Sequence, residues 1–220
     1  MKKIAILASG SGSNAEAIVQ YFGRVSDIRV ECIITNNPRA GVIDRAHRLN
    51  VPLYYYSNDA MRDGSQPIEL LQYIEIDLVV LAGYMCLITE PWLRAFPDRI
   101  INIHPALLPA YGGKGMYGMN VHRAVIEAGE HQSGITIHLV DREYDHGRHL
   151  LQASCSVRDG DTPESLAARI HTLEHRFLAP LIEQYLREEC QTDMLPKGGC
   201  CSALLRRSLP HTEGQNTQNI

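Results

Sequence analysis

Short apolar runs alternate with helix-like stretches over the first part of the chain. Three runs rich in β-branched and aliphatic residues each end at small or polar residues, and they span 4–8, 30–35 and 77–82. Unbroken apolar runs of this length are typical of strands that are buried on both faces of a parallel sheet. Stretches with the helical period lie between and after them, at 15–22, 42–49 and 68–74. This order predicts a doubly wound α/β domain with a ligand crevice at the carboxyl edge of its strands.

The pattern changes after Gly83. We expect further strands at 99–104, 134–140 and 150–157, the last two suited to antiparallel pairing, and helices at 91–96, 121–128 and 162–186. The C-terminal portion of a mostly parallel sheet is therefore predicted to be antiparallel. The segment 187–220 has no periodicity and a polar end, which predicts a disordered tail after a domain that spans 1–186.

Composition narrows the class of protein. A chain of 220 residues with 45% hydrophobic content can bury one sizeable core. The net charge of −4 gives no basic field for nucleic acid or an anionic membrane, and no apolar run approaches the roughly 18 residues of a membrane span. The six cysteines lack metal-ligand spacing. We expect a cytoplasmic protein with reduced cysteines and no metal, which binds neither nucleic acid nor a membrane.

A glycine- and serine-rich loop, residues 9–14, separates the first predicted strand from the first predicted helix. The free N–H groups and the dipole at a helix start suit a phosphate. The loop lacks the Gly-Lys-Ser/Thr of a P-loop and matches the dinucleotide signature only with Ala15 in the last place. We favour a monophosphate site; the alternative is a tight turn that merely caps a helix.

Two polar residues, Asn102 and His104, lie two apart at the end of a predicted strand, with Pro105 directly behind them. Their side chains leave the same face of the strand, toward the expected crevice. An amide can donate to a developing oxyanion, and an imidazole can move a proton near neutral pH. On this pattern alone, a satisfied polar pair at a strand end is an equally good interpretation.

Asp145 is the third candidate. It lies in a loop after a later strand and could fold over the same edge, where a carboxylate would orient the imidazole of His104 and raise its pKa. By itself it would be an ordinary turn residue. Other polar residues carry less weight. Glu174 could reach the crevice or be solvated, and Cys86 fits an apolar wall. His138 lies within a strand pattern, a packing or surface role is predicted for His122, His131 and His149, and no ligand set emerges from these histidines.

Five stretches occur in a characteristic order along residues 2–186: ILASGSGSN, DLVVLAGYM, INIHPALLPAYGG, EYDHG and LEH. With them the chain resembles the glycinamide ribonucleotide (GAR) formyltransferases, a folate-dependent family of purine biosynthesis. The resemblance implies a Rossmann-like formyltransferase fold, with a nucleotide-binding half at 1–100 and a folate and catalytic half at 101–186. It implies transfer of the formyl group of 10-formyltetrahydrofolate to the amine of GAR, without a metal, by a monomer or a homodimer.

The resemblance also implies roles for individual residues. The catalytic residues would be Asn102, His104 and Asp145. The substrate phosphate would be held by Gly12, Ser13 and Asn14, and the ribose would be approached by Glu174. The folate would contact Arg62, Met85, Cys86, Leu87, Ile88 and Asn102.

The chain departs from the family pattern at three places. Cys86 stands where the family commonly has arginine, so only backbone and van der Waals contact is expected there. Arg148 follows Gly147 where the family usually has Gly-Pro, so the shape of that loop cannot be carried over. The GGKGMYG segment, residues 112–118, resembles one branch of the family and is expected to form a lid over the nucleotide.

Several alternatives stay open at this point. A formyltetrahydrofolate hydrolase is expected to have an additional N-terminal domain, and a methionyl-tRNA formyltransferase an additional C-terminal domain, so both are less favoured. A sugar-nucleotide formyltransferase would use the same three catalytic residues. A catalytically silent nucleotide-binding module would need only the glycine-rich loop.

Overall fold

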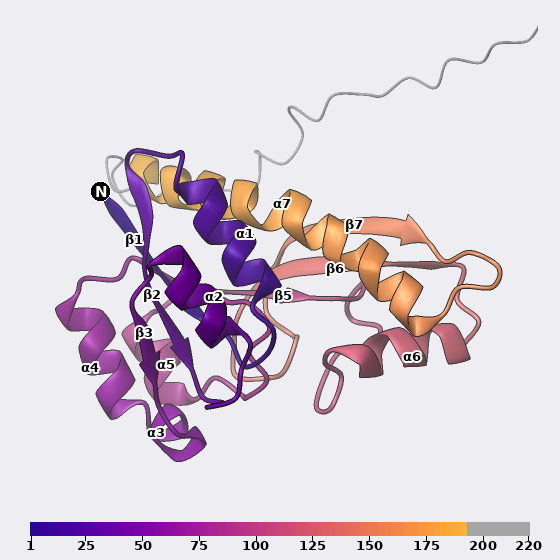
Figure 1. Cartoon of the computed structure of the whole chain (residues 1–220), viewed down its shortest axis with the longest axis horizontal. Helices are drawn as coiled ribbons and strands as arrows, with labels where there is room; N and C mark the ends of the chain where they lie inside the picture. Colours follow the sequence, from indigo (N-terminus) through magenta and orange to yellow (C-terminus); the bar gives the residue numbers. More distant parts are fainter. Residues whose placement is uncertain (193–220) are drawn as a thin grey trace, which may run out of the picture.

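The computed structural model describes residues 1–192, which form one seven-stranded sheet flanked by helices (Figure 1). The order of the strands in space is β3-β2-β1-β4-β5-β6-β7. Neighbouring strands are parallel from β3 to β5, whereas β6 is antiparallel to both β5 and β7. The predicted fold class is therefore confirmed. The strands are β1 (Lys2–Leu7), β2 (Ile28–Thr35), β3 (Leu53–Tyr55), β4 (Leu78–Leu81), β5 (Ile100–His104), β6 (Gln132–Leu139) and β7 (His149–Ser156).

Within residues 1–192, seven helices connect and cover the strands. They are α1 (Ser13–Phe22), α2 (Val42–Leu49), α3 (Asn58–Asp63), α4 (Ser65–Tyr73), α5 (Glu90–Ala95), α6 (Met119–Glu127) and α7 (Pro163–Thr192). The sequence pattern missed β3, whose three residues are too few to display a period, and α3, in which Met61 is the buried residue and no apolar face repeats.

The last helix is longer than predicted. It continues through residue 192, so residues 187–192 are helical and not part of a disordered tail. Leu186 is fully buried, and Arg187 pairs with Asp27 at 2.9 Å and with Glu183 at 2.8 Å, which fastens this turn to the domain. The rest of the predicted tail, 193–220, lies outside the described residues.

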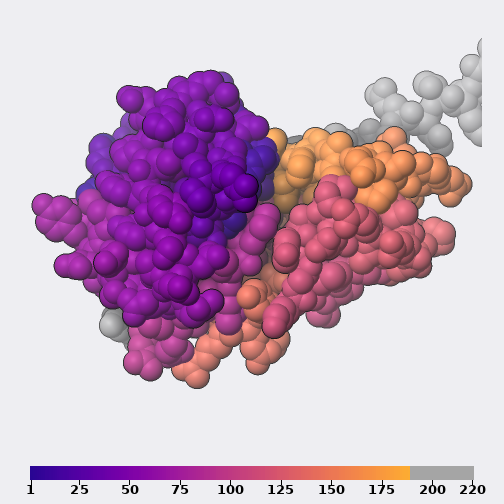
Figure 2. Space-filling model, turned by 60° about the horizontal axis from the view of Figure 1, so that its bottom comes forward, coloured from indigo at the N-terminus to yellow at the C-terminus, as the bar shows by residue number. Residues whose placement is uncertain are grey.

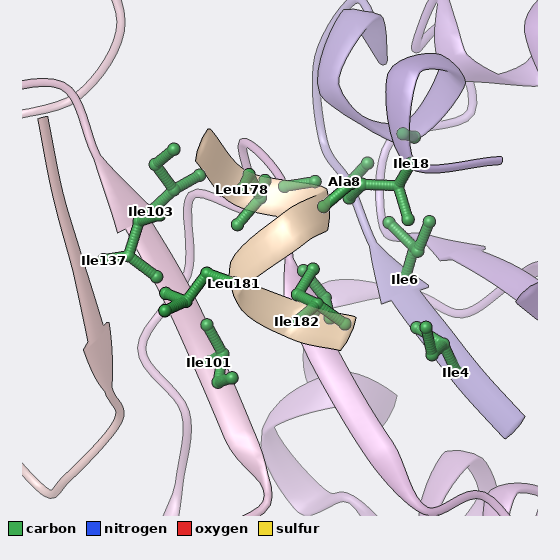
Figure 3. Packing of buried hydrophobic residues seen from close by; sticks show 14 of the residues in the cluster. Ile4, Ile6, Ala8, Ile18, Ile101, Ile103, Ile137, Leu178, Leu181 and Ile182 are labelled. Atoms are coloured by element: carbon green, nitrogen blue, oxygen red, sulfur yellow. The ribbon is translucent and has the colours of Figure 1, made fainter. Parts of the chain in front are cut away.

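The central strands are buried on both faces of the sheet, as β1 illustrates. Ile4 and Ile6 pack toward α1 and α7, where they meet residues such as Ile182 (Figure 3). Ala5 and Leu7 belong to a second cluster on the opposite face, formed with α3, α4 and α5. Successive side chains of a strand leave opposite faces, so a strand covered on both sides is apolar at every position.

The chain reverses its direction of winding between β1 and β4. From β1 it proceeds outward to β2 and β3, and it then returns to place β4 on the other side of β1. Loops that leave the carboxyl ends of such a strand pair diverge and open a crevice. The N–H of Ser9 donates to the carbonyl of Gly83 at 3.0 Å, so the two loops are joined where they start. The N-terminal and C-terminal halves meet along the face seen in Figure 2.

None of the helices in residues 1–192 is both long enough and apolar enough to cross a bilayer.

Candidate active site

One cavity of about 460 Å³ lies at the carboxyl edge of the sheet, a size typical of small-molecule sites. Four stretches of chain contribute most of its wall: 10–14, 81–88, 102–105 and 113–118. The 143–145 loop and several side chains of α6, β6 and α7 complete it. Every predicted site residue except Arg62 lines this cavity.

The glycine-rich loop is pressed against the start of α2. Gly12 has φ +79°, and a Cβ added there would lie 2.5 Å from Cγ2 of Val42. The N–H of Val42 donates to the carbonyl of Gly10 at 3.1 Å. Only glycine combines this left-handed backbone with so close an approach, so the contact with α2 fixes the shape of the loop.

Asn14 and Glu174 form a buried pair beside this loop. Nδ2 of Asn14 donates to Oε2 of Glu174 at 3.0 Å, and Glu174 is 5% exposed. Burial raises the pKa of the Glu174 carboxyl, against the opposing effects of the Asn14 hydrogen bond and of His171. Within residues 1–192, the buried Oδ1 of Asn14 has no partner. Of the two alternatives for Glu174, the structure therefore selects the crevice over the solvated surface.

The structure brings Asn102, His104 and Asp145 together. Oδ1 of Asp145 lies 3.3 Å from Nδ2 of Asn102 and 3.4 Å from Nδ1 of His104. Oδ2 of Asp145 accepts the N–H of Gly113 at 3.0 Å. One carboxylate thus contacts Asn102 and His104 of β5 and, through Gly113, the loop that follows this strand.

His104 is held from both sides of its ring. Nε2 lies 2.8 Å from the carbonyl oxygen of Tyr111, and Nδ1 faces Asp145. Two oxygen acceptors suit the charged imidazolium, but burial is the larger effect and lowers the pKa of His104 below 6.5 despite the opposing effects of Asp145 and the Tyr111 carbonyl. The predicted effect of Asp145 is present, since Asp145 raises this pKa, but burial outweighs it because His104 is only 4% exposed.

Asp145 remains an anion. Burial alone would raise its pKa, but the nearby rings of His138 and His104 and the hydrogen bond from the N–H of Gly113 together lower it. Its backbone has φ +56°, a conformation that a non-glycine residue adopts only when its surroundings impose it. The carboxylate is therefore held in place by its turn as well as by its partners.

His138 is a site residue that the sequence pattern placed only within a strand. It pairs with Asn102 across β5 and β6, and its Nε2 lies 3.0 Å from Nδ2 of Asn102 and 3.7 Å from Oδ1 of Asp145. Its Nδ1 lies 2.8 Å from the carbonyl of Leu139. With the proton on Nδ1, Nε2 accepts from Asn102. Only the register of an antiparallel pair, which the local sequence does not display, could have located it.

His122 is the second residue that the sequence pattern missed. It lies on α6, is 2% exposed and lines the cavity. Burial is the main cause that lowers its pKa to about 4, with smaller effects from the charges of His171 and His104. Its Nδ1 has no partner in the part of the chain that the structure describes. Its neighbours Val121 and Val125 are buried, so its place beside the apolar face of this helix was the available signal.

The segment 85–88 forms a mixed wall. Met85 and Leu87 are partly exposed at the cavity, and Ile88 is buried. Cys86 makes more than the expected backbone and van der Waals contact, because Nδ2 of Asn36 lies 3.2 Å from its sulfur as a donor. An apolar wall next to convergent polar groups fits a flat heterocycle such as a pterin.

Arg62 is not brought to the cavity. It lies on α3 with an exposed side chain that pairs with Asp59 at 3.1 Å. Its carbonyl accepts a hydrogen bond from Thr89 at 2.8 Å. Its contact with folate stays a prediction, as does the lid role of 112–118.

No cluster of three or more metal-binding side chains occurs among residues 1–192. The site as described is built from a glycine-rich loop, an amide, imidazoles and carboxylates around one cavity. These features define an α/β protein with one cavity whose groups are suited to proton transfer and oxyanion stabilisation.

The chain belongs to the formyl transferase family, whose model matches residues 2–182. It is 42% identical to a chloroplastic phosphoribosylglycinamide formyltransferase of Arabidopsis thaliana over 82% of this chain and 64% of that one. It is 38% identical to the phosphoribosylglycinamide formyltransferase of Bacillus subtilis over 84% of this chain and 95% of that one. The chain thus spans less than two thirds of the plant relative and nearly all of the bacterial one.

Solved structures agree with this assignment. Glycinamide ribonucleotide transformylase 1 from Symbiobacterium toebii superposes with a TM-score of 0.74 at 39% identity, and the alignment covers 83% of this chain and 86% of that one.

Proposed function

We propose that this protein transfers the formyl group of 10-formyltetrahydrofolate to the amine of GAR, a step of purine biosynthesis. One observation carries the proposal: a single cavity joins the glycine-rich loop, suited to a phosphate, to the cluster of Asn102, His104 and Asp145. The relatives named for this activity support the choice of acceptor and donor.

Proton transfer is assigned to His104. The amine of GAR attacks the formyl carbon and must lose a proton, while N10 of the folate leaves and must gain one. Because Nε2 of His104 is engaged by the carbonyl of Tyr111, Nδ1 is the ring nitrogen that would exchange this proton, directly or through a water. Asp145 stabilises the charged ring and burial stabilises the neutral ring, so both protonation states are accessible.

Asn102 is assigned to the oxyanion of the tetrahedral intermediate, together with His104. Its Nδ2 donates to Asp145 and faces the acceptor nitrogen of His138. The oxyanion must therefore replace one of these two partners. A donor already oriented by its neighbours reorganises little, and loss of one such donor typically costs about 10² to 10³ in rate.

The remaining assignments follow from which residues line the cavity. We assign the phosphate of GAR to Gly12, Ser13 and Asn14, and the ribose to Glu174. We assign the folate to the segment Met85–Ile88, to Asn102 and, as a contact that closure of α3 would have to supply, to Arg62. We also propose that the protein works in the cytoplasm as a monomer or a homodimer, which cell fractionation and light scattering would test.

An acceptor comparison tests the proposed function. The purified chain is given 10-formyltetrahydrofolate with GAR, with a sugar nucleotide amine, or with no acceptor, and formation of tetrahydrofolate is followed. We expect turnover only with GAR. Turnover without acceptor would indicate a hydrolase, turnover with the sugar nucleotide alone would indicate the other transferase, and none in any case would indicate a silent binding module.

A further inference from the structure

Two helices hold the glycine-rich loop, and one arginine joins them. Arg45, one turn into α2, donates from Nε to the carbonyl of Ser11 at 2.8 Å. The same guanidinium forms an ion pair with Glu16 in the first turn of α1. Arg48 also pairs with Glu16, at 2.6 Å, but within residues 1–192 it forms no hydrogen bond or ion pair with the loop.

The contacts from α2 determine where the N–H groups of the loop point. In a trans peptide the carbonyl oxygen and the N–H of the next residue lie on opposite sides of the chain. Val42 holds the carbonyl of Gly10, and Arg45 holds the carbonyl of Ser11. The N–H groups of Ser11 and Gly12 therefore point away from α2. Both residues line the cavity. In residues 1–192 neither N–H donates to a protein acceptor.

We infer that Arg45 is a positioning residue for the substrate phosphate, which it orients indirectly by fixing the Ser11–Gly12 peptide so that its N–H faces the phosphate. The inference rests on the proposed function and extends it to a residue outside the cavity wall. Arg45 also leaves a net positive charge beside the loop, because one Glu16 faces two arginines. The effects of position and charge can be separated, since of these two arginines Arg45 is the one that donates a hydrogen bond to the loop in the described part of the chain.

Three variants separate these two effects. Arg45→Met removes both the hydrogen bond and the charge, Arg48→Met removes a charge from the same glutamate, and Arg45→Lys keeps the charge without the forked contact to Ser11 and Glu16. For Arg45→Met we expect KM for GAR to rise about tenfold, the loss typical of a hydrogen bond that serves a charged group, with KM for 10-formyltetrahydrofolate unchanged. We expect Arg45→Lys to remain impaired and Arg48→Met to stay within about twofold of wild type.

A binding measurement gives a second readout that does not depend on turnover. Ribose 5-phosphate is titrated into isotopically labelled protein, and the amide resonance of Gly12 is followed by NMR. We expect a saturable shift of this resonance in wild type and in Arg48→Met, and a shift that saturates only at about tenfold higher concentration in both Arg45 variants. If Arg45→Met does not fold, Arg45→Lys provides the comparison.

Equal behaviour of Arg45→Met and Arg48→Met would overturn the inference, and so would full recovery in Arg45→Lys, because charge alone would then account for the effect. Failure of the proposed function has a different signature: wild type would not formylate GAR, while the ribose 5-phosphate titration would still decide the role of Arg45.

Discussion

Gly12 provides a sharp test of the loop geometry, because a matched glycine exists elsewhere in the chain. Gly12 and Gly160 both have φ +79°, but a Cβ at Gly12 would lie 2.5 Å from Val42, whereas at Gly160 nothing lies within 4 Å. Gly12→Ala therefore combines strain of the backbone with a steric clash, and Gly160→Ala has the strain alone. The difference between the two variants isolates the clash.

The expected sizes follow from typical values. A left-handed backbone costs an alanine about 1 kcal/mol, and overpacking of a buried contact adds about 2 kcal/mol. For a domain of this size, each kcal/mol lowers Tm by roughly 3 °C. We expect Gly12→Ala to lower Tm by about 9 °C and to raise KM for GAR, and Gly160→Ala to lower Tm by about 3 °C with KM unchanged.

Calorimetry and steady-state kinetics on the two variants provide the measurement. Equal losses of Tm would show that Val42 does not constrain the loop. An unchanged KM for GAR in Gly12→Ala would remove the loop from the phosphate site.

Three further predictions concern the histidines and Asp145. His104→Ala and Asp145→Asn are each expected to lower kcat by about 10³-fold, the usual range for loss of acid–base catalysis; near wild-type turnover in either variant would sink the assignment. His138→Ala is expected to lower kcat about tenfold, because Asn102 loses the acceptor 3.0 Å from its amide nitrogen, and a normal kcat would confine His138 to packing. His122 has a pKa of about 4 in the folded protein against 6.5 when exposed, so the unfolded chain binds the proton first and the free energy of unfolding falls as pH decreases from 6.5 to 4. Urea titrations across this range measure the free energy of unfolding at each pH. We expect its decrease to be smaller in His122→Leu than in wild type by up to about 3 kcal/mol. An equal decrease in the two proteins would contradict the neutral, buried state of His122.

Much of the fold and of the candidate site could be predicted from the sequence, because the patterns that indicate them are local. The glycine-rich loop of residues 9–14 follows an apolar run directly, and Asn102 and His104 share a strand, so their common face follows from the two-residue period. Asp145 could be placed in a loop by its pattern and proposed as the partner of His104, although by itself it would have been an ordinary turn residue. These features needed no knowledge of how distant segments pair.

What the sequence could not supply depends on distant segments. His138 enters the site through its register opposite Asn102, and the contact of His104 with Tyr111 uses a backbone carbonyl that any residue would provide. The direction of the His104 pKa shift is set by burial under several elements, which outweighs the nearby carboxylate. Local pattern therefore predicted which residues line the cavity but not the electrostatic balance among them.

The destination of the formyl carbon tests the central claim most directly. 10-Formyltetrahydrofolate labelled with carbon-13 in its formyl group is incubated with GAR and the protein, and the products are followed by NMR. We predict that the label appears in the formamide of formyl-GAR in step with formation of tetrahydrofolate. Label found in free formate, with GAR unchanged, would contradict formyl transfer to GAR.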